Sequence, residues 1–257
     1  MNPVVFITGA SSGIGQALAA RFYDGGYDLA LVARRTTDIE EWARARQMPV
    51  ERYQIYRADV AAIDSIVAAG MACVARQGVP DVVIANAGIS VGIDTAERAD
   101  LDVLACTLAT NNVGLAATFH PFVAAMAQRG SGRLVGIGSV AAIRGLPGHG
   151  AYCASKAGVV AYCESLRGEL RLSGVKVVTV CPGYIDTPLT QGNRYGMPFL
   201  MQADDFAEQA FRAIETGTSY CVIPWQMGVV AKLMRLLPNA LFDRLVQGRA
   251  RKKRVGE

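Results

Sequence analysis

The stretch that decides the fold is Val4-Val5-Phe6-Ile7-Thr8-Gly9-Ala10-Ser11-Ser12-Gly13-Ile14-Gly15. It joins a short apolar run to a glycine-rich turn, and an amphipathic helical pattern follows the turn. The unbroken apolar run predicts a buried parallel strand. Glycines allow a tight turn and a close approach to a ligand, and the following helix offers unpaired N–H groups and the positive end of its dipole. The stretch therefore predicts a pyrophosphate site, although a glycine-rich turn taken alone is a weak signal.

Composition narrows the class of protein. The chain has 257 residues, of which 51% are hydrophobic and 19% charged, enough for the core of one α/β domain. No leader pattern precedes the first strand, and the six cysteines form no C-x-x-C pair, so we expect a reduced, cytoplasmic setting and no metal site. The net charge of +4 arises entirely from Arg249 to Glu257. The neutral body therefore offers no face for nucleic acid.

A second apolar run, Asp28 to Ala33, ends at Arg34 and Arg35. In a dinucleotide-binding fold, an acidic residue at this point accepts hydrogen bonds from the ribose hydroxyls, whereas a basic residue meets a 2′-phosphate. The next acid is Asp38, so the sequence favours NADP(H) over NAD(H). The alternative is that both arginines are solvated loop residues.

Apolar runs and helical patterns then alternate, about a dozen residues apart, which is typical of a doubly wound parallel sheet. Two asparagines and a glycine (Asn111, Asn112 and Gly114) fall inside the longest helical pattern, and helix propensity does not explain them. We expect strands at 50–58, 81–85, 133–138, 175–181 and 220–223, and helices at 38–46, 63–77, 101–128, 151–172 and 204–216.

Three side chains have the chemistry for proton transfer. Tyr152 and Lys156 are four residues apart on one predicted helix, so they project from the same face. An ammonium beside a phenol favours the phenolate and is expected to lower the Tyr152 pKa from its reference of about 10. Ser139 follows a strand at the edge where open parallel sheets bind ligands, and its hydroxyl suits a substrate carbonyl oxygen. A lone Tyr/Lys pair is usually only surface, but its combination with a dinucleotide turn indicates catalysis.

Taken together, these motifs resemble the short-chain dehydrogenase/reductase family, in its single-domain branch. They fall in family order and at family spacing from residue 4 to about residue 223, with no departure at a motif position. The matching elements are Thr8-Gly9-Ala10-Ser11-Ser12-Gly13-Ile14-Gly15, Asp59-Val60, Asn86-Ala87-Gly88, Asn111-x-x-Gly114, Ser139, Tyr152-x-x-x-Lys156 and Pro182-Gly183 followed by Thr187.

The resemblance implies a role for each motif residue. Tyr152 would be the general acid/base, and Lys156 both its pKa partner and a ribose ligand. Ser139 would orient the substrate, and Asn111 (favoured over Asn112 by its spacing to Gly114) would hold a water in a proton relay. The implied cofactor contacts are Gly9, Ser11, Gly13, Ile14 and Gly15 for the pyrophosphate, Arg34 and Arg35 for the 2′-phosphate, Asp59 and Val60 for the adenine, Asn86 and Gly88 for the adjoining ribose, and Ile185 and Thr187, after Pro182 and Gly183, for the nicotinamide.

The residues after the last motif are read as substrate-facing. Residues 188–202 form a long, irregular, apolar stretch that is typical of a lid, or that packs the next helix. It contains no obvious carboxylate or phosphate clamp, which suggests an apolar ketone or alcohol. His149 lies either near the pocket mouth or, more simply, in a plain loop.

Residues 225–257 extend beyond the usual end of the family. Two amphipathic helical stretches, 225–237 and 239–249, precede the basic tail. Either these helices cover the pocket or a neighbouring subunit and the tail is solvated, or the segment lies on an anionic membrane at the inner face. Interspersed charge and Pro238 prevent it from spanning a bilayer.

We therefore expect a Rossmann-type, three-layered domain in residues 1–224 with strand order 3-2-1-4-5-6-7, and extra helices in 225–257. The expected activity is NADP(H)-dependent hydride transfer between the nicotinamide and a ketone/secondary alcohol pair, as a reductase of an apolar or lipid-like carbonyl compound. The alternatives are an NADP(H)-sensing regulator without turnover and a membrane-associated scaffold. The family implies a homodimer or homotetramer formed through the helices at 101–128 and 151–172.

Overall fold

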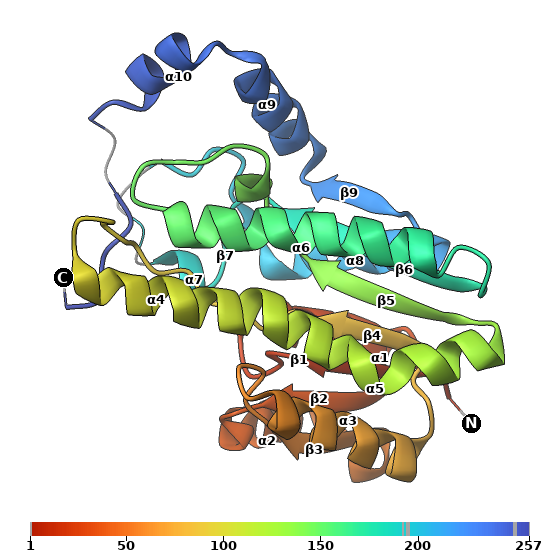
Figure 1. The fold of residues 1–257 in the computed structure, drawn as a ribbon. Coiled ribbons are helices and arrows are strands. Elements are labelled where there is room, and N and C mark those ends of the chain that lie inside the picture. Colours follow the sequence, from red (N-terminus) through yellow and green to blue (C-terminus); the bar gives the residue numbers. More distant parts are fainter. Residues whose placement is uncertain (1, 192, 194–195, 249–250, 257) are drawn as a thin grey trace.

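A seven-stranded parallel sheet lies at the centre of the computed structural model, with helices on both faces (Figure 1). The structure describes residues 2–191, 193, 196–248 and 251–256. The strand order β3-β2-β1-β4-β5-β6-β9 confirms the predicted fold class and the predicted 3-2-1-4-5-6-7 arrangement, since β9 is the seventh strand to enter this sheet. A separate pair, β7 and β8, was not predicted.

The elements have the following bounds. The strands are β1 (Val4–Thr8), β2 (Asp28–Ala33), β3 (Tyr53–Arg57), β4 (Val82–Ala85), β5 (Gly132–Ile137), β6 (Val175–Pro182), β7 (Ile185–Asp186), β8 (Met201–Gln202) and β9 (Tyr220–Ile223). The α-helices are α1 (Gly13–Asp24), α2 (Thr36–Ala45), α3 (Ile63–Gln77), α4 (Arg98–Leu108), α5 (Gly114–Arg129), α6 (Gly150–Glu169), α7 (Pro188–Gln191), α8 (Ala203–Thr216), α9 (Trp225–Leu236) and α10 (Asn239–Val246). The shorter turns are η1 (Val50–Arg52), η2 (Ala109–Val113) and η3 (Val140–Ala142).

Two predicted elements differ from the observed ones. The strand expected at 50–58 begins with the 3₁₀ turn η1, because Pro49 fixes the backbone before it. The single helix expected at 101–128 consists of α4, the π-helical turn η2 and α5. Turns of this kind are rare and frequently occur at functional sites. The asparagine pair lies in η2, so the residues that propensity could not explain mark a local change in helix type.

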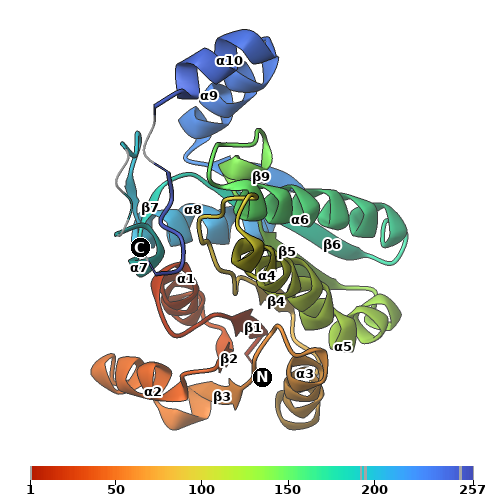
Figure 2. The ribbon, with the colours of Figure 1, turned by 60° about the vertical axis from the view of Figure 1, so that its left-hand side comes forward.

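The core has two layers, one on each face of the sheet. β1 alternates between them: Val5 and Ile7 pack toward α1, α2 and α8, whereas Phe6 packs toward α3, α5 and α6. Figure 2 shows α1 and α8 on one side of the sheet and α3, α5 and α6 on the other. All three of these β1 side chains are fully buried, which explains the unbroken apolar run of the first strand. Each such side chain contributes roughly 1.5–3 kcal/mol by leaving water.

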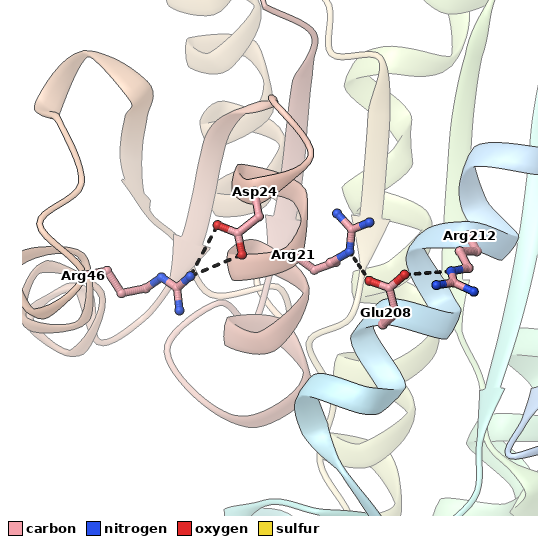
Figure 3. Close-up of polar contacts among 5 residues, drawn as sticks. All are labelled: Arg21, Asp24, Arg46, Glu208 and Arg212. Atoms are coloured by element: carbon pink, nitrogen blue, oxygen red, sulfur yellow. Dashed lines mark hydrogen bonds and ion pairs between the residues drawn. The ribbon is translucent and has the colours of Figure 1, made fainter.

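Charged side chains link α1 to α8 at the surface of the first layer (Figure 3). Arg21 contacts Glu208, and Glu208 also accepts a hydrogen bond of 2.7 Å from Arg212 Nε. The Arg21 guanidinium lies 3.8 Å from the centroid of the Phe211 ring. Exposed ion pairs contribute little, so apolar packing between the two helices carries most of this attachment. Because α8 follows residues 188–202, the attachment fixes the far end of the predicted lid.

No helix among the residues described above has both the length and the apolar character needed to cross a membrane. The last two helices, α9 and α10, project from the edge of the sheet beyond β9 (Figure 1). After them the end of the chain, residues 251–256, returns to lie beside α7 and the start of α4 in both views (Figures 1 and 2).

Candidate active site

The glycine-rich turn joins β1 to α1 at the carboxyl edge of the sheet. Gly9 and Gly13 have φ angles of +69° and +56°, in the left-handed region that favours glycine. A Cβ on Gly15 would lie only 2.2 Å from the Gly9 carbonyl oxygen, so the turn and the helix pack backbone against backbone. Ser12, the N-cap of α1, makes no side-chain hydrogen bond to the helix. The first N–H groups of α1 are therefore available to an anion.

Asn86 braces this turn against the end of β4. Its Nδ2 donates to the Thr8 carbonyl oxygen at 2.9 Å and to the Gly9 carbonyl oxygen at 3.4 Å. The backbone amides of Asn86 and Ala87 donate to Thr8 Oγ1 at 3.1 and 3.2 Å. The sequence predicts that Asn86 contacts the ribose. In the structure its side-chain amide holds the glycine-rich turn in shape.

Arg34 and Arg35 follow β2 directly and differ in their contacts. Their side chains are 71% and 68% exposed. Arg34 Nη1 lies 3.7 Å from an oxygen of Asp59, one of the two residues predicted at the adenine. Arg35 Nε donates to Asp38 at 2.8 Å. Arg34 therefore borders the predicted adenosine region, whereas Arg35 is paired within the start of α2.

Three of the predicted catalytic side chains meet between α6 and the end of β5. Lys156 Nζ lies 5.8 Å from the centroid of the Tyr152 ring and donates to the Ile137 carbonyl oxygen at 2.8 Å. Ser139 comes directly after β5, and its side chain is hydrogen-bonded to Tyr152. Ser139 and Lys156 are buried, with exposed fractions of 6% and 5%.

Burial controls the protonation of this group. Desolvation raises the pKa of Tyr152 to about 12, and the hydrogen bond from Ser139 acts in the opposite direction. Desolvation lowers the pKa of Lys156 to about 8. The expectation that Lys156 lowers the Tyr152 pKa is therefore wrong for the protein alone. Loss of hydration outweighs the ammonium, whose hydrogen bond goes to the backbone of Ile137.

Asn111 and Lys156 both border the loop after β4 at Gly88. Its Nδ2 donates to the Ile89 carbonyl oxygen at 3.0 Å, and its Oδ1 accepts from the Ile89 amide at 2.8 Å. A Cβ on Gly88 would lie 3.1 Å from Asn111 Oδ1 and 3.5 Å from Lys156 Nζ. The absence of a side chain at Gly88 thus lets the loop after β4 approach both polar groups.

Asn112, the alternative to Asn111, points elsewhere. Its Nδ2 donates to the Ser155 carbonyl oxygen at 2.8 Å, and a Cβ on Gly158 would lie 2.6 Å from that nitrogen. Asn111 Nδ2 donates instead to Ser155 Oγ at 2.9 Å, and Ser155 Oγ donates to the Tyr152 carbonyl oxygen at 2.8 Å. Asn112 therefore braces α6, and Asn111 belongs to the group around Tyr152 and Lys156.

The segment after β6 meets the start of α1. Gly183 N donates to the Ile223 carbonyl oxygen at 2.8 Å, which ties the Pro182-Gly183 corner to β9. Ile185 and Thr187 are 2% and 6% exposed. A Cβ on Gly13 would lie 3.2 Å from Thr187 Cβ, so the residues predicted at the nicotinamide adjoin the pyrophosphate turn.

A cavity of about 110 Å³ opens beside Ser139 and Tyr152. His149, 8% exposed, lines it, and burial lowers the His149 pKa. The side chains that complete its apolar wall come from the loop before α6 and from α9: Leu146, Met227, Ala231 and Met234. Sequence motifs did not identify this wall, because an apolar side chain at helical spacing carries the same pattern whether it faces a core or a ligand.

Residues 251–256 do not form the solvated tail that the sequence suggested. Gly92 N donates to the Lys253 carbonyl oxygen at 2.8 Å, and the Lys252 side chain lines the cavity. Basic composition predicts attraction to some acidic group, but it does not say which one. The sequence did not predict the contacts of residues 251–256, because the partners of these residues lie about 150 positions earlier in the chain.

A doubly wound domain with a glycine-rich turn after β1 and a Ser/Tyr/Lys group beside a cavity defines the class of protein. Residues 3–197 match the family model described as short chain dehydrogenase. The chain belongs to that family, as its motifs predicted. An uncharacterized oxidoreductase from Myxococcus xanthus is 37% identical over 240 residues, which cover 92% of this chain and 93% of the relative.

Solved structures share the fold and differ in their cofactor. A short-chain dehydrogenase from Sphingobium yanoikuyae in complex with NADPH is 27% identical, with a TM-score of 0.77 over 93% of this chain and 97% of that protein. A 3-ketoacyl-(acyl-carrier-protein) reductase from Brucella melitensis complexed with NADH is 26% identical, with a TM-score of 0.77 over 86% of this chain and 94% of that protein. The fold alone therefore does not select between the two nicotinamide cofactors.

Proposed function

We propose that the protein is an NADP(H)-dependent oxidoreductase that reduces a ketone to a secondary alcohol. The observation that carries this proposal is the group formed by buried Ser139 and Lys156 with half-buried Tyr152, beside an apolar cavity. The glycine turn supports a dinucleotide, because its left-handed residues and uncapped helix leave N–H groups for a pyrophosphate.

The side chains have distinct parts in this chemistry. When bound, NADPH supplies the hydride. A Tyr152 pKa of about 12 keeps the phenol protonated at neutral pH, which is the form that donates a proton to a carbonyl oxygen. Ser139 hydrogen-bonds the same oxygen and orients it. Lys156 lies beside the Tyr152 ring, so it would pass a proton back to the phenolate, and Asn111 would hold a water in that relay.

The test for catalysis follows NADPH oxidation with ketones graded from small polar compounds to long apolar ones. We expect turnover to rise with apolarity, and Tyr152→Phe to lower kcat by about 10²–10⁴-fold while NADPH binding stays nearly unchanged. Tyr53→Phe is the matched control and should behave as wild type, because this half-buried tyrosine lies at the start of β3, away from the carboxyl edge of the sheet. Tight NADPH binding without turnover of any ketone would instead favour the sensing regulator.

The choice of NADP(H) over NAD(H) rests on Arg34. Its guanidinium is exposed beside Asp59, whereas Arg35 is held by Asp38. We expect Arg34→Ala to raise the KM for NADPH by about 10- to 100-fold, since a charge-assisted phosphate contact is lost, and to leave the KM for NADH nearly unchanged. Arg35→Ala should have a smaller effect. An unchanged NADPH/NADH ratio in Arg34→Ala would contradict this assignment.

Assembly into a homodimer or homotetramer is proposed from the outer face of η2, α5 and α6. Val113 and Tyr162 are 45% and 39% exposed there, and both border a second apolar hollow with His120 and Leu166. A charge in the middle of such a face opposes association. Val113→Glu should therefore reduce the mass measured by light scattering, and an unchanged mass would exclude this face.

We propose, second, that α9 and α10 contact an anionic membrane. Apart from this contact, we propose a cytoplasmic protein. Leu233, Leu236 and Leu241 are 59%, 79% and 55% exposed, and Lys232 and Arg235 lie among them. Because α9 also walls the cavity, truncation would damage the site. Flotation with anionic liposomes should therefore compare wild type with the double variant Leu236→Asp/Leu241→Asp, and equal partitioning would remove the proposal.

A further inference from the structure

The end of the chain, residues 251–256, is seated on the loops around the cavity; we refer to it as the C-terminal strap. A Cβ on Gly92 would lie 2.1 Å from the Lys252 carbonyl oxygen. A Cβ on Gly148 would lie 2.9 Å from Arg251 Cβ. The strap thus passes between the loop after β4 and the loop before α6, and glycine on each loop gives it room.

Ion pairs fix the strap in this position. Arg254 Nε and Nη2 lie 2.7 and 3.3 Å from the two carboxylate oxygens of Asp100, which is buried at 4% exposure. Asp100 also accepts a hydrogen bond of 2.6 Å from the Asp94 amide. Arg251 lies 3.8 Å from the Asp94 carboxylate. A bidentate pair with a buried carboxylate sets both the register and the direction of the strap.

This register directs the Lys252 side chain into the wall of the cavity. Lys252 Nζ donates to the Leu189 carbonyl oxygen at 3.1 Å and to Asn193 Oδ1 at 2.8 Å. An ammonium has three donors, so these two neutral acceptors leave capacity for a further acceptor in the cavity. Neither partner neutralises the charge. Among the described residues that line the cavity there is no Asp or Glu.

Arg144 is the other strongly basic side chain in the part of the cavity lining that the structure describes, and its donors are already used within the protein. Arg144 Nη1 donates to the carbonyl oxygens at the end of α9, including that of Leu237 at 2.8 Å, and Nη2 donates to Asn239 Oδ1 at 3.1 Å. The Arg144 guanidinium lies 3.8 Å from the centroid of the Phe242 ring. Arg144 therefore joins α9 to α10, which leaves Lys252 as the described lining residue whose positive charge borders the cavity.

We infer that Lys252 is a specificity residue that binds the carboxylate of an oxo-acid substrate. The carbonyl group of that substrate would lie at Ser139 and Tyr152, and its apolar chain would lie along Leu146 and Met234. A single ammonium balances a single negative charge, which favours a carboxylate over a doubly charged phosphate. This inference rests on the proposed reductase function. It also changes the expected substrate from a wholly apolar compound to an apolar chain that ends in a carboxylate.

The test compares methyl-ketone acids of increasing chain length with their methyl esters, which keep the carbonyl and lose the charge. For the chain length that wild type prefers, Lys252→Met should lower kcat/KM for the acid by about 10- to 100-fold and leave the ester nearly unchanged. Lys253→Met is the matched control, because Lys253 is exposed and contacts the protein through its backbone. Lys252→Arg keeps the charge and should keep the preference for the acid.

A binding measurement separates this inference from the proposed function. Calorimetry with nonanoate and methyl nonanoate needs no turnover, and nonanoate should bind wild type and Lys253→Met more tightly than Lys252→Met. If the protein reduces no ketone, the proposed function is overturned. If nonanoate binding is nevertheless lost in Lys252→Met, the role of Lys252 in binding a carboxylate is supported. Ketone reduction in which Lys252→Met lowers kcat/KM equally for acid and ester would overturn the role of Lys252.

Discussion

The cofactor side of the molecule, residues 4–187, and the substrate wall, formed by α7, α9, α10 and the C-terminal strap, are held together in different ways. On the cofactor side, the glycine-rich turn, Arg34, Asn86 and Ser139 lie just beyond strand ends, which neighbouring parallel strands bring to one edge. The remaining functional groups are placed at this edge by the helical elements η2 and α6. In the substrate wall, side chains from α9 and from the strap reach the cavity through contacts with loops far away in the sequence. The first arrangement follows from local pattern and sheet topology, and the second depends on individual long-range partners.

The difference predicts how the two regions respond to substitution. On the cofactor side the backbone is packed on both sides, so an added side chain has no room. Such a substitution should lower both the free energy of unfolding and cofactor binding. A change in the wall meets side chains at the surface of the fold, so it should alter the reaction more than the stability. Substitutions at Gly15 and Arg254 test this contrast, and the pH dependence at Lys156 measures how burial on the cofactor side changes the binding of one proton.

The largest effect is expected for Gly15→Ala. The new Cβ would lie 2.2 Å from the Gly9 carbonyl oxygen and 2.6 Å from Asn86 Nδ2, so α1 must move away from the turn. We expect the free energy of unfolding to fall by about 1–3 kcal/mol, as for other overpacked sites, and NADPH binding to be lost. Denaturant unfolding and fluorescence titration with NADPH measure the two effects.

Gly168→Ala is the control for this change. Gly168 lies in α6, and a Cβ added there would have no heavy atom within 4 Å beyond its own neighbourhood in the helix. Alanine in a helix should raise the free energy of unfolding by up to about 1 kcal/mol. Wild-type NADPH affinity in Gly15→Ala would show that the turn tolerates a shift of α1 and would weaken the contrast between the two regions.

The cofactor side is also where sequence reasoning succeeded. The family and the strand order followed from the resemblance that the motifs carry. The approach of Tyr152 to Lys156 followed from spacing on one helix, and the place of Ser139 followed from the end of a strand. The same reasoning failed at the Tyr152 pKa, because burial of the phenol depends on packing from the rest of the fold. It also failed at Lys252, whose position depends on the pairing of Arg254 with Asp100. The charge composition shows that arginines and aspartates are present, but it does not show that Arg254 pairs with Asp100.

An intermediate effect is expected for Arg254→Met in the substrate wall. Removal of the guanidinium leaves the buried Asp100 carboxylate without its bidentate partner, so the strap should open more often. We expect hydrogen exchange at the Gly92 amide, which donates to Lys253, to become about 10-fold faster, while unfolding of the whole domain is nearly unchanged.

Lys253→Met serves as the control here too, since it removes a neighbouring positive charge and keeps the Asp100 pair. If both variants accelerate exchange equally, the net charge of the strap holds it in place and the Arg254–Asp100 pair does not. If Arg254→Met also lowers the stability of the whole domain, the wall is as tightly integrated as the cofactor side.

The smallest effect concerns pH and is expected at Lys156, which is buried on the cofactor side. The pKa of Lys156 is about 8 in the folded protein, against 10.5 for an ordinary lysine. Between these values the folded state has released a proton that the unfolded state still binds, so stability rises with pH in this window. Lys156→Met lacks this proton. The free energy of unfolding of wild type, relative to Lys156→Met, should therefore increase by about 1 kcal/mol between roughly pH 8 and pH 9, and a flat difference would show that Lys156 keeps its charge in the folded protein.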